Sequence, residues 1–161
     1  MKEIKMTIQE TLKMLSNNDN FDAVIQNYQS CFDEIDSIIE ELKADALADE
    51  SAIASAQTKL TGLYGTIITI FKMAQAIKIQ KEAQTFVRLN EEYETENPGA
   101  KPLSAAKLEK QTNIELGNYR MLRNIFEGYV MAAEKAIITC QSNIKNMKSE
   151  RIFNSTNPEK Y

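Results

Sequence analysis

The stretch IITIFKMAQAIKIQKEAQ, residues 67–84, begins as an apolar run and ends as a ladder of lysines. On a helical wheel at about 100° per residue, Ile67, Phe71 and Ala74 mark the centre of one stripe. One acidic residue, Glu82, interrupts the basic residues around that stripe. We therefore expect one long helix whose seam changes from apolar to charged along its length. The basic residues within roughly 60° of the stripe are Lys59, Lys78, Lys81 and Arg88.

The helix that contains this stretch is predicted to run from Ser51 to Glu94, because only Gly62 and Gly65 weaken it. Each glycine costs about 1 kcal/mol relative to alanine in a helix interior. The segment LYGTIITIF also resembles a strand, but the helical spacing of its apolar residues favours a helix. Small residues at this point would let another backbone approach closely.

A loop is expected at ETENPGAKPL, residues 94–103, where Asn97-Pro98-Gly99 and Pro102 prevent a helix from continuing. Ser104 then suits the N-cap of a second long helix, Ser104–Ile152. From Leu116 onward the apolar residues of this helix recur in steps of 3 or 4, which is coiled-coil spacing. They are Tyr119, Leu122, Phe126, Tyr129, Ala133, Ile137, Cys140, Ile144 and Met147.

Charge is distributed unevenly along the chain. Residues 1–50 hold 4 Lys/Arg and 12 Asp/Glu, a net charge of −8. Residues 51–161 hold 15 Lys/Arg and 11 Asp/Glu, a net charge of +4, so the whole chain carries −4. An acidic start on a mildly basic body predicts two surfaces with different roles.

The acidic first fifty residues are predicted to form a short helix, a break at Ser16–Asn20 and a longer amphipathic helix from Phe21 to Leu42. Side chains suited to cap the longer helix are Asp19 or Asn20, and those suited to cap the helix after it are Asp49 or Ser51.

Together these elements predict an all-α protein of one domain, built on a long antiparallel helical hairpin with coiled-coil-like packing. Residues 51–94 and 104–152 form the hairpin, residues 1–50 add acidic N-terminal helices, and residues 153–161 form a flexible tail. Because Leu60–Phe71 is apolar nearly all round, we expect the N-terminal helix or a second copy to cover it. The predicted oligomer interface consists of Leu60, Tyr64, Ile67, Phe71, Phe126 and Tyr129.

The composition argues against an enzyme. The chain contains no histidine, which is the side chain most used in acid–base catalysis near pH 7 and the commonest metal ligand. Neither a glycine-rich phosphate loop nor a C-x-x-C pair occurs. We therefore predict no catalytic residue, no metal ligand and no cofactor. Cys31 and Cys140 lie among apolar residues, which is typical of buried free thiols in a reducing cytoplasm.

No membrane attachment is expected from the sequence. The N-terminal MKEIKMTIQE lacks the apolar core of a signal sequence. The longest uncharged apolar stretch has about twelve residues, whereas a membrane span needs about twenty. These features predict a cytoplasmic protein, in the cytoplasm of the host if a phage encodes it.

The lysine ladder has three interpretations. In the first, the hairpin splays near Asn90–Pro98 and its end is solvated. In the second, several copies associate through the apolar half and align their basic halves as a track for phosphates, which binds nucleic acid without sequence preference. The return helix would add Lys107, Lys110, Arg120 and Arg123 to that track. In the third, the helix lies on a membrane surface; this is weaker, because apolar and basic parts follow each other along the axis.

Residues 51–152 resemble the UvsY family of phage recombination mediators, small helical proteins that load a RecA-like recombinase onto single-stranded DNA. The likeness lies in a long basic-ended helix, a polar loop with KPLSAAKLEK, and the helix YRMLRNIFEGYVMAAEKAIITCQSNIKNMKSE. The resemblance implies a ring-like homo-oligomer that binds the DNA backbone through the first long helix. Carried over by position, the binding residues are Lys72, Lys78, Lys81 and Arg88. The acidic first fifty residues and the small basic surplus depart from that pattern.

The sequence thus leaves three functional hypotheses. The first is a non-enzymatic, oligomeric recombination mediator that binds single-stranded DNA and contacts a recombinase and a single-strand-binding protein. The second is a structural or assembly protein, such as a virion or scaffold component, with no nucleic-acid role. The third is an inhibitor whose acidic face, Asp33–Asp45, imitates DNA.

Overall fold

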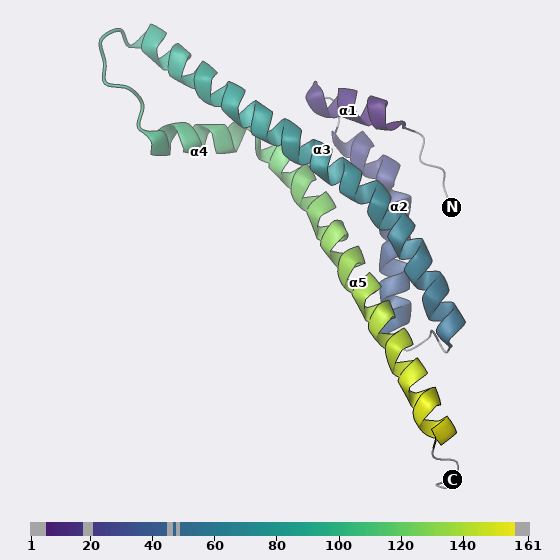
Figure 1. The fold of residues 1–161 in the computed structure, drawn as a ribbon. Coiled ribbons are helices and arrows are strands. Elements are labelled where there is room, and N and C mark those ends of the chain that lie inside the picture. Colours follow the sequence, from purple (N-terminus) through teal and green to yellow (C-terminus); the bar gives the residue numbers. More distant parts are fainter. Residues whose placement is uncertain (1–5, 18–20, 45–46, 48, 157–161) are drawn as a thin grey trace. The chain divides into compact units, whose positions relative to one another are not determined.

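The computed structural model of the chain describes residues 6–17, 21–44, 47 and 49–156, which fold into five α-helices (Figure 1). No strand occurs in these ranges, and α3 and α5 pack against each other. The predicted all-α fold with a long helical hairpin is confirmed. The helices are α1 (Ile8–Ser16), α2 (Phe21–Lys43), α3 (Glu50–Glu96), α4 (Ala105–Glu115) and α5 (Gly117–Thr156).

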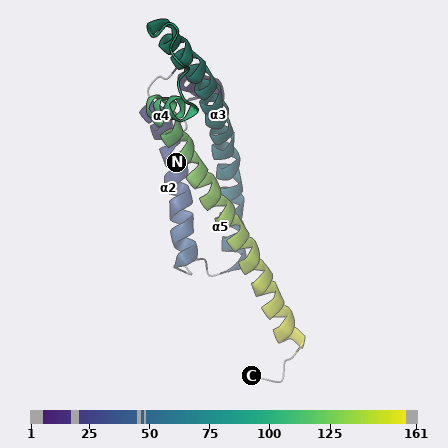
Figure 2. The ribbon, with the colours of Figure 1, turned by 90° about the vertical axis from the view of Figure 1, so that its left-hand side faces the viewer.

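The first of two compact units comprises the described residues of Tyr28–Ile68 and Gly128–Tyr161. It holds the later part of α2, the early part of α3 and the later part of α5, which lie side by side (Figures 1 and 2). The Phe32 ring stacks on the Tyr129 ring with centroids 4.1 Å apart, and the Tyr129 hydroxyl donates to Asp36 at 2.9 Å. Its buried apolar residues include Ile35, Ile53, Leu60, Ile67, Ala133 and Cys140.

The second unit comprises the described residues of Ile4–Asn27 and Thr69–Glu127. It holds α1, the start of α2, the later part of α3, α4 and the start of α5. The Phe21 ring meets the Tyr119 ring edge-on, with centroids 4.8 Å apart. Its buried apolar residues include Leu15, Val24, Ile70, Ala74, Ile77, Leu122 and Phe126.

Polar side chains cap the N-termini of α3 and α4 at positions that the sequence indicates. Asp49 accepts a hydrogen bond from the Ala52 amide at 2.7 Å, which satisfies one of the unpaired amides at the start of α3. Ser104 does the same for the Lys107 amide of α4 at 3.4 Å. The break after α1 follows Ser16 as expected. The residues proposed to cap α2, Asp19 and Asn20, lie outside the described residues.

Two helix boundaries differ from the sequence prediction. The return segment is not one helix from Ser104 to Ile152, because α4 ends at Glu115 and α5 begins at Gly117. Leu116 between them has φ −102° and ψ 19°, outside the α-helical region, and the Gly117 that follows it is a poor helix former. The predicted tail also begins too early, since α5 continues through residues 153–156.

The loop between α3 and α4 lies where the sequence predicts it. Helix α3 ends at Glu96, and Gly99 in the loop adopts a positive φ of 81°. That backbone conformation strains residues with a Cβ, so glycine is required there. By contrast, Gly62 and Gly65 lie inside α3 with nothing within 4 Å of where a Cβ would stand. The close backbone approach expected at these two glycines is therefore absent from the described part of the chain.

Helix α3 is long and apolar enough to cross a membrane, judged by length and composition alone. The core helix of a soluble protein has the same length and composition. Several of its apolar residues, such as Leu60, Ile67 and Ile70, are fully buried among the other helices of their units. The apolar run that dominates the sequence of α3 thus supplies the core.

Candidate functional site

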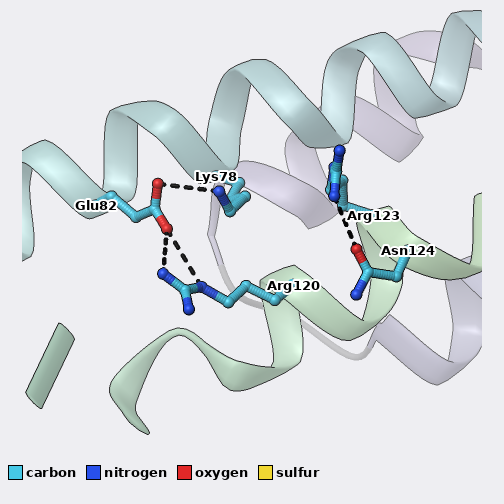
Figure 3. A network of polar contacts seen from close by, with 5 residues as sticks. All are labelled: Lys78, Glu82, Arg120, Arg123 and Asn124. Atoms are coloured by element: carbon cyan, nitrogen blue, oxygen red, sulfur yellow. Dashed lines mark hydrogen bonds and ion pairs between the residues drawn. The ribbon is translucent and has the colours of Figure 1, made fainter. Parts of the chain in front are cut away.

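The candidate site is the charged half of α3 together with the start of α5, both in the second unit. Here Glu82 accepts hydrogen bonds from two cations (Figure 3). The Lys78 Nζ atom lies 3.1 Å from Glu82 Oε2, one helical turn away on α3. The Arg120 guanidinium, which comes from α5, lies 2.7 Å from Glu82 Oε1 through Nη2 and 3.3 Å through Nε. Glu82 therefore links α3 to α5.

The environment of Glu82 stabilises its charged form. Only 25% of its side chain is exposed. Burial by itself would raise the pKa of Glu82, but the hydrogen bonds from Arg120 and Lys78 outweigh that effect and hold the pKa below its ordinary value. Glu82 is thus an ionised, shared acceptor for two residues of the predicted phosphate track.

Arg88, one heptad beyond Lys81, is also paired. Its Nη1 atom donates to both carboxylate oxygens of Glu92, at 2.7 and 2.8 Å. Its Nη2 atom forms an ion pair with Glu115 at the end of α4. These two carboxylates already occupy the guanidinium edges that a DNA phosphate would need.

Arg123 is held in the same way on α5. It donates to Glu127 at 2.8 Å and to Asn124 at 2.9 Å, as Figure 3 shows for Asn124. Its guanidinium also lies 5.7 Å from the centre of the Phe71 ring, within the range of a cation–π contact. The Lys72 ammonium lies over the same ring at 5.2 Å.

The eight predicted nucleic-acid contacts therefore divide into two groups. Four of them form ion pairs with carboxylates of the same unit: Lys78, Arg88, Arg120 and Arg123. The other four form no ion pair with any residue that the structure describes: Lys72, Lys81, Lys107 and Lys110. The continuous basic track expected from the sequence is thus interrupted by acidic partners.

The partners themselves were not singled out by the sequence reasoning, apart from Glu82. Signals for some of them exist, because Lys78–Glu82, Arg88–Glu92 and Arg123–Glu127 are all spaced i,i+4. The pairings of Arg88 with Glu115 and of Arg120 with Glu82 join different helices. They depend on how the two arms align, which no local pattern reveals.

Most of the predicted oligomer interface lies inside the chain's own core. Leu60, Ile67 and Phe126 are fully buried, and Phe71 is 8% exposed. Tyr64 and Tyr129 are half-buried, and Tyr129 already contacts its own chain through Phe32 and Asp36. Since the chain covers Leu60, Ile67, Phe71 and Phe126 itself, these four side chains are not open to a second copy.

A different apolar stripe is exposed, on the outer face of the later part of α3. Ile79 is 56% exposed and Phe86 is 43% exposed, and they stand seven residues apart. Ala76 and Ala83, which are also exposed, alternate with them. The four side chains follow steps of 3 and 4, which places them on one face of the helix. We call this set the outer stripe.

Metal and cysteine chemistry find little support in the described residues. Across these ranges, no group of three or more His, Cys, Asp and Glu side chains could hold a metal ion. Cys31 and Cys140 are buried and free, as predicted. Burial raises the pKa of both thiols, and a nearby carboxylate, Glu34, raises that of Cys31 further.

A scan against protein-family models found no match to this chain, and searches of curated proteins and of solved structures found none either. The resemblance to the UvsY family, with the single-stranded DNA, recombinase and single-strand-binding partners that it implies, stays a prediction.

Proposed function

We propose that the chain is a non-enzymatic helical assembly protein that acts by self-association, as a structural or scaffold component of the cytoplasm. The observation that carries the proposal is the outer stripe of α3, a heptad-spaced apolar face left open by the helices of its own unit. Exposed faces of this kind on a helix are typical of binding surfaces for another helix.

Two further observations support this function over catalysis and over strong DNA binding. The absence of histidine removes the usual acid–base group and metal ligand. The ion pairs of Lys78, Arg88 and Arg120 engage cations that a phosphate track would require. Releasing Lys78 or Arg120 to a phosphate would take a cation away from Glu82, whose side chain is only 25% exposed, and this costs free energy.

The test is the mass of the protein in solution, measured by light scattering for the unmodified chain and for Phe86→Asp. Burying a phenylalanine stabilises an interface by about 1.5–3 kcal/mol, so a charge there weakens association by roughly tenfold or more. We expect the unmodified chain to associate at micromolar concentration and Phe86→Asp to be largely monomeric. The matched control is Gln84→Asp, which adds the same charge at an exposed position off the stripe.

A monomeric mass for the unmodified chain refutes the proposal. If Gln84→Asp dissociates the assembly as much as Phe86→Asp does, added charge in general is responsible and the outer stripe is not the interface. Because Phe86 is partly exposed, its replacement leaves the core of the second unit intact.

A second candidate function, binding of single-stranded DNA as a recombination mediator, is favoured by the four lysines that form no ion pair with a described residue. Lys107 and Lys110 lie one turn apart on exposed faces of α4, and Lys81 is half-buried on α3. In an assembly these lysines would be repeated in every copy. Their weak individual attraction for phosphates would then add up.

Fluorescence anisotropy of a labelled oligothymidine, measured against salt concentration, tests this candidate. Each contacted phosphate should contribute a slope of about −0.7 to the logarithm of affinity against the logarithm of salt concentration. Replacing Lys107 and Lys110 by alanine should flatten the slope, whereas Lys78→Ala should leave it unchanged because Lys78 is engaged by Glu82. Absence of salt-dependent binding at low ionic strength excludes this function.

A further inference from the structure

The outer stripe has a pattern that specifies its own partner. Along α3 it reads Ala76, Ile79, Ala83, Phe86, so that small and large side chains alternate at the two heptad positions. A second copy of the same stripe running in the opposite direction places each large residue opposite a small one. A copy running in the same direction places large against large and small against small, which leaves gaps and clashes.

Resting on the self-association proposed above, we propose that two copies of the chain pair through α3 in antiparallel orientation about a two-fold axis. Ile79 of each copy then packs against Ala83 of the other, and Phe86 of each packs against Ala76 of the other. Such a contact is self-complementary, as a two-fold interface requires.

The residues at the two ends of the stripe fix the alignment. Lys72 precedes the stripe by one turn and Asn90 follows it by one turn, and in this alignment they face each other across the interface. Lys72 is exposed and Asn90 is half-buried, so both remain hydrated at the rim. Shifting one copy by a heptad would place Ile79 against Asn90 or Phe86 against Thr69. Either shift exchanges an apolar contact for a polar one.

The alignment also predicts distances that differ between the two orientations. Its centre falls midway between Ile79 and Ala83, nine residues from Lys72. At 1.5 Å per residue, the two copies of position 72 then stand about 27 Å apart along the axis, as do the two copies of position 90. Position 72 of one copy lies beside position 90 of the other. A parallel pair would instead bring each position next to itself.

Disulfide cross-linking tests this arrangement, using Lys72→Cys and Asn90→Cys made in separate chains. A disulfide requires Cα atoms within about 7 Å, so we expect cross-linked dimer after oxidation only when the two variants are mixed. The unsubstituted chain, whose two cysteines are buried, gives the background. Gln84→Cys mixed with Lys72→Cys is the matched control for random collision, since Gln84 is exposed but lies off the stripe.

The mass of every variant is also measured by light scattering, so that cross-linking and association are read separately. Cross-linking in the mixture alone supports antiparallel pairing. Cross-linking of either variant with itself shows a parallel pair and overturns the inference. An associated mass with no cross-link in the mixture also overturns it, while self-association by another surface stands. A monomeric mass refutes both this inference and the proposed function.

Discussion

At the scale of single residues, Glu82 explains why charged side chains occupy a face of α3 that begins as core. The wheel that places Lys78 on the apolar stripe also places it beside Glu82 of α3, which pairs in turn with Arg120 of α5. Lysine stems pack against apolar neighbours while their ammonium groups reach a carboxylate. The change from apolar to charged along α3 therefore reflects a change from apolar packing to ion pairs in its contacts with α5.

This network predicts a specific sensitivity to acid. The pKa of Glu82 is lower in the folded chain than its ordinary value of 4.5, so the folded state binds fewer protons there than the unfolded state. The stability that Glu82 contributes is complete above about pH 5 and is lost as the pH falls through the lower, folded-state pKa. Glu82→Gln should cost about 1–3 kcal/mol at neutral pH and should make unfolding less dependent on pH below about 5.

Denaturant unfolding at several pH values measures this effect. The control is Glu109→Gln, an exposed carboxylate on α4 that forms no ion pair with any described residue. If Glu82→Gln and Glu109→Gln have the same pH dependence, the network does not stabilise the fold.

The two cysteines give a second prediction at this scale. Burial raises the pKa of Cys31 and Cys140, so little thiolate forms at neutral pH and reagents reach the sulfur slowly. A thiol-reactive dye should label neither cysteine in the native protein and both in denaturant. Rapid labelling of a native thiol would show that the packing of α2 or α5 around it is wrong.

At the scale of helices, Gly62 and Gly65 weaken α3, although no close contact within their unit requires a glycine at either position. Both have open space where a Cβ would stand and both have helical backbone. Replacing either by alanine should stabilise the protein by about 1 kcal/mol, measured by thermal unfolding. Gly99→Ala is the matched control and should destabilise it, because Gly99 has a positive φ. A loss of stability at Gly62 or Gly65 would show that something packs closely against that face in solution.

The helices were largely predictable from the sequence, and the contacts between their charged ends were not. Local rules located α3, the loop at Asn97-Pro98-Gly99 and the Ser104 cap, because each depends on neighbouring residues. The break at Leu116 was missed because no proline marks it and because Leu116 itself begins the regular apolar spacing of the return helix. The pairing of Arg88 with Glu115 joins helices from opposite sides of the loop, so the alignment of the arms had to be seen first.

At the scale of the whole molecule, the sequence could not show which apolar residues are buried within the chain and which are open to a second copy. Apolar spacing marks Leu60, Ile67 and Phe126 as part of a seam, but it does not say whether that seam is covered by the same chain or by a second copy. The chain covers them itself, which shifts the expectation of assembly to the outer stripe. Ile79 and Phe86 are also apolar and heptad-spaced, and only the structure shows that they are exposed and open to a second copy.

We propose that this protein acts through contacts between its own copies, and half of its predicted DNA-binding cations already form ion pairs within the chain. Light scattering of the unmodified chain at micromolar concentration and physiological salt, with and without a single-stranded oligonucleotide, tests it most directly. We predict a mass of two or more copies that the oligonucleotide leaves unchanged. A monomeric mass, or a mass that rises only when the oligonucleotide is present, would contradict it.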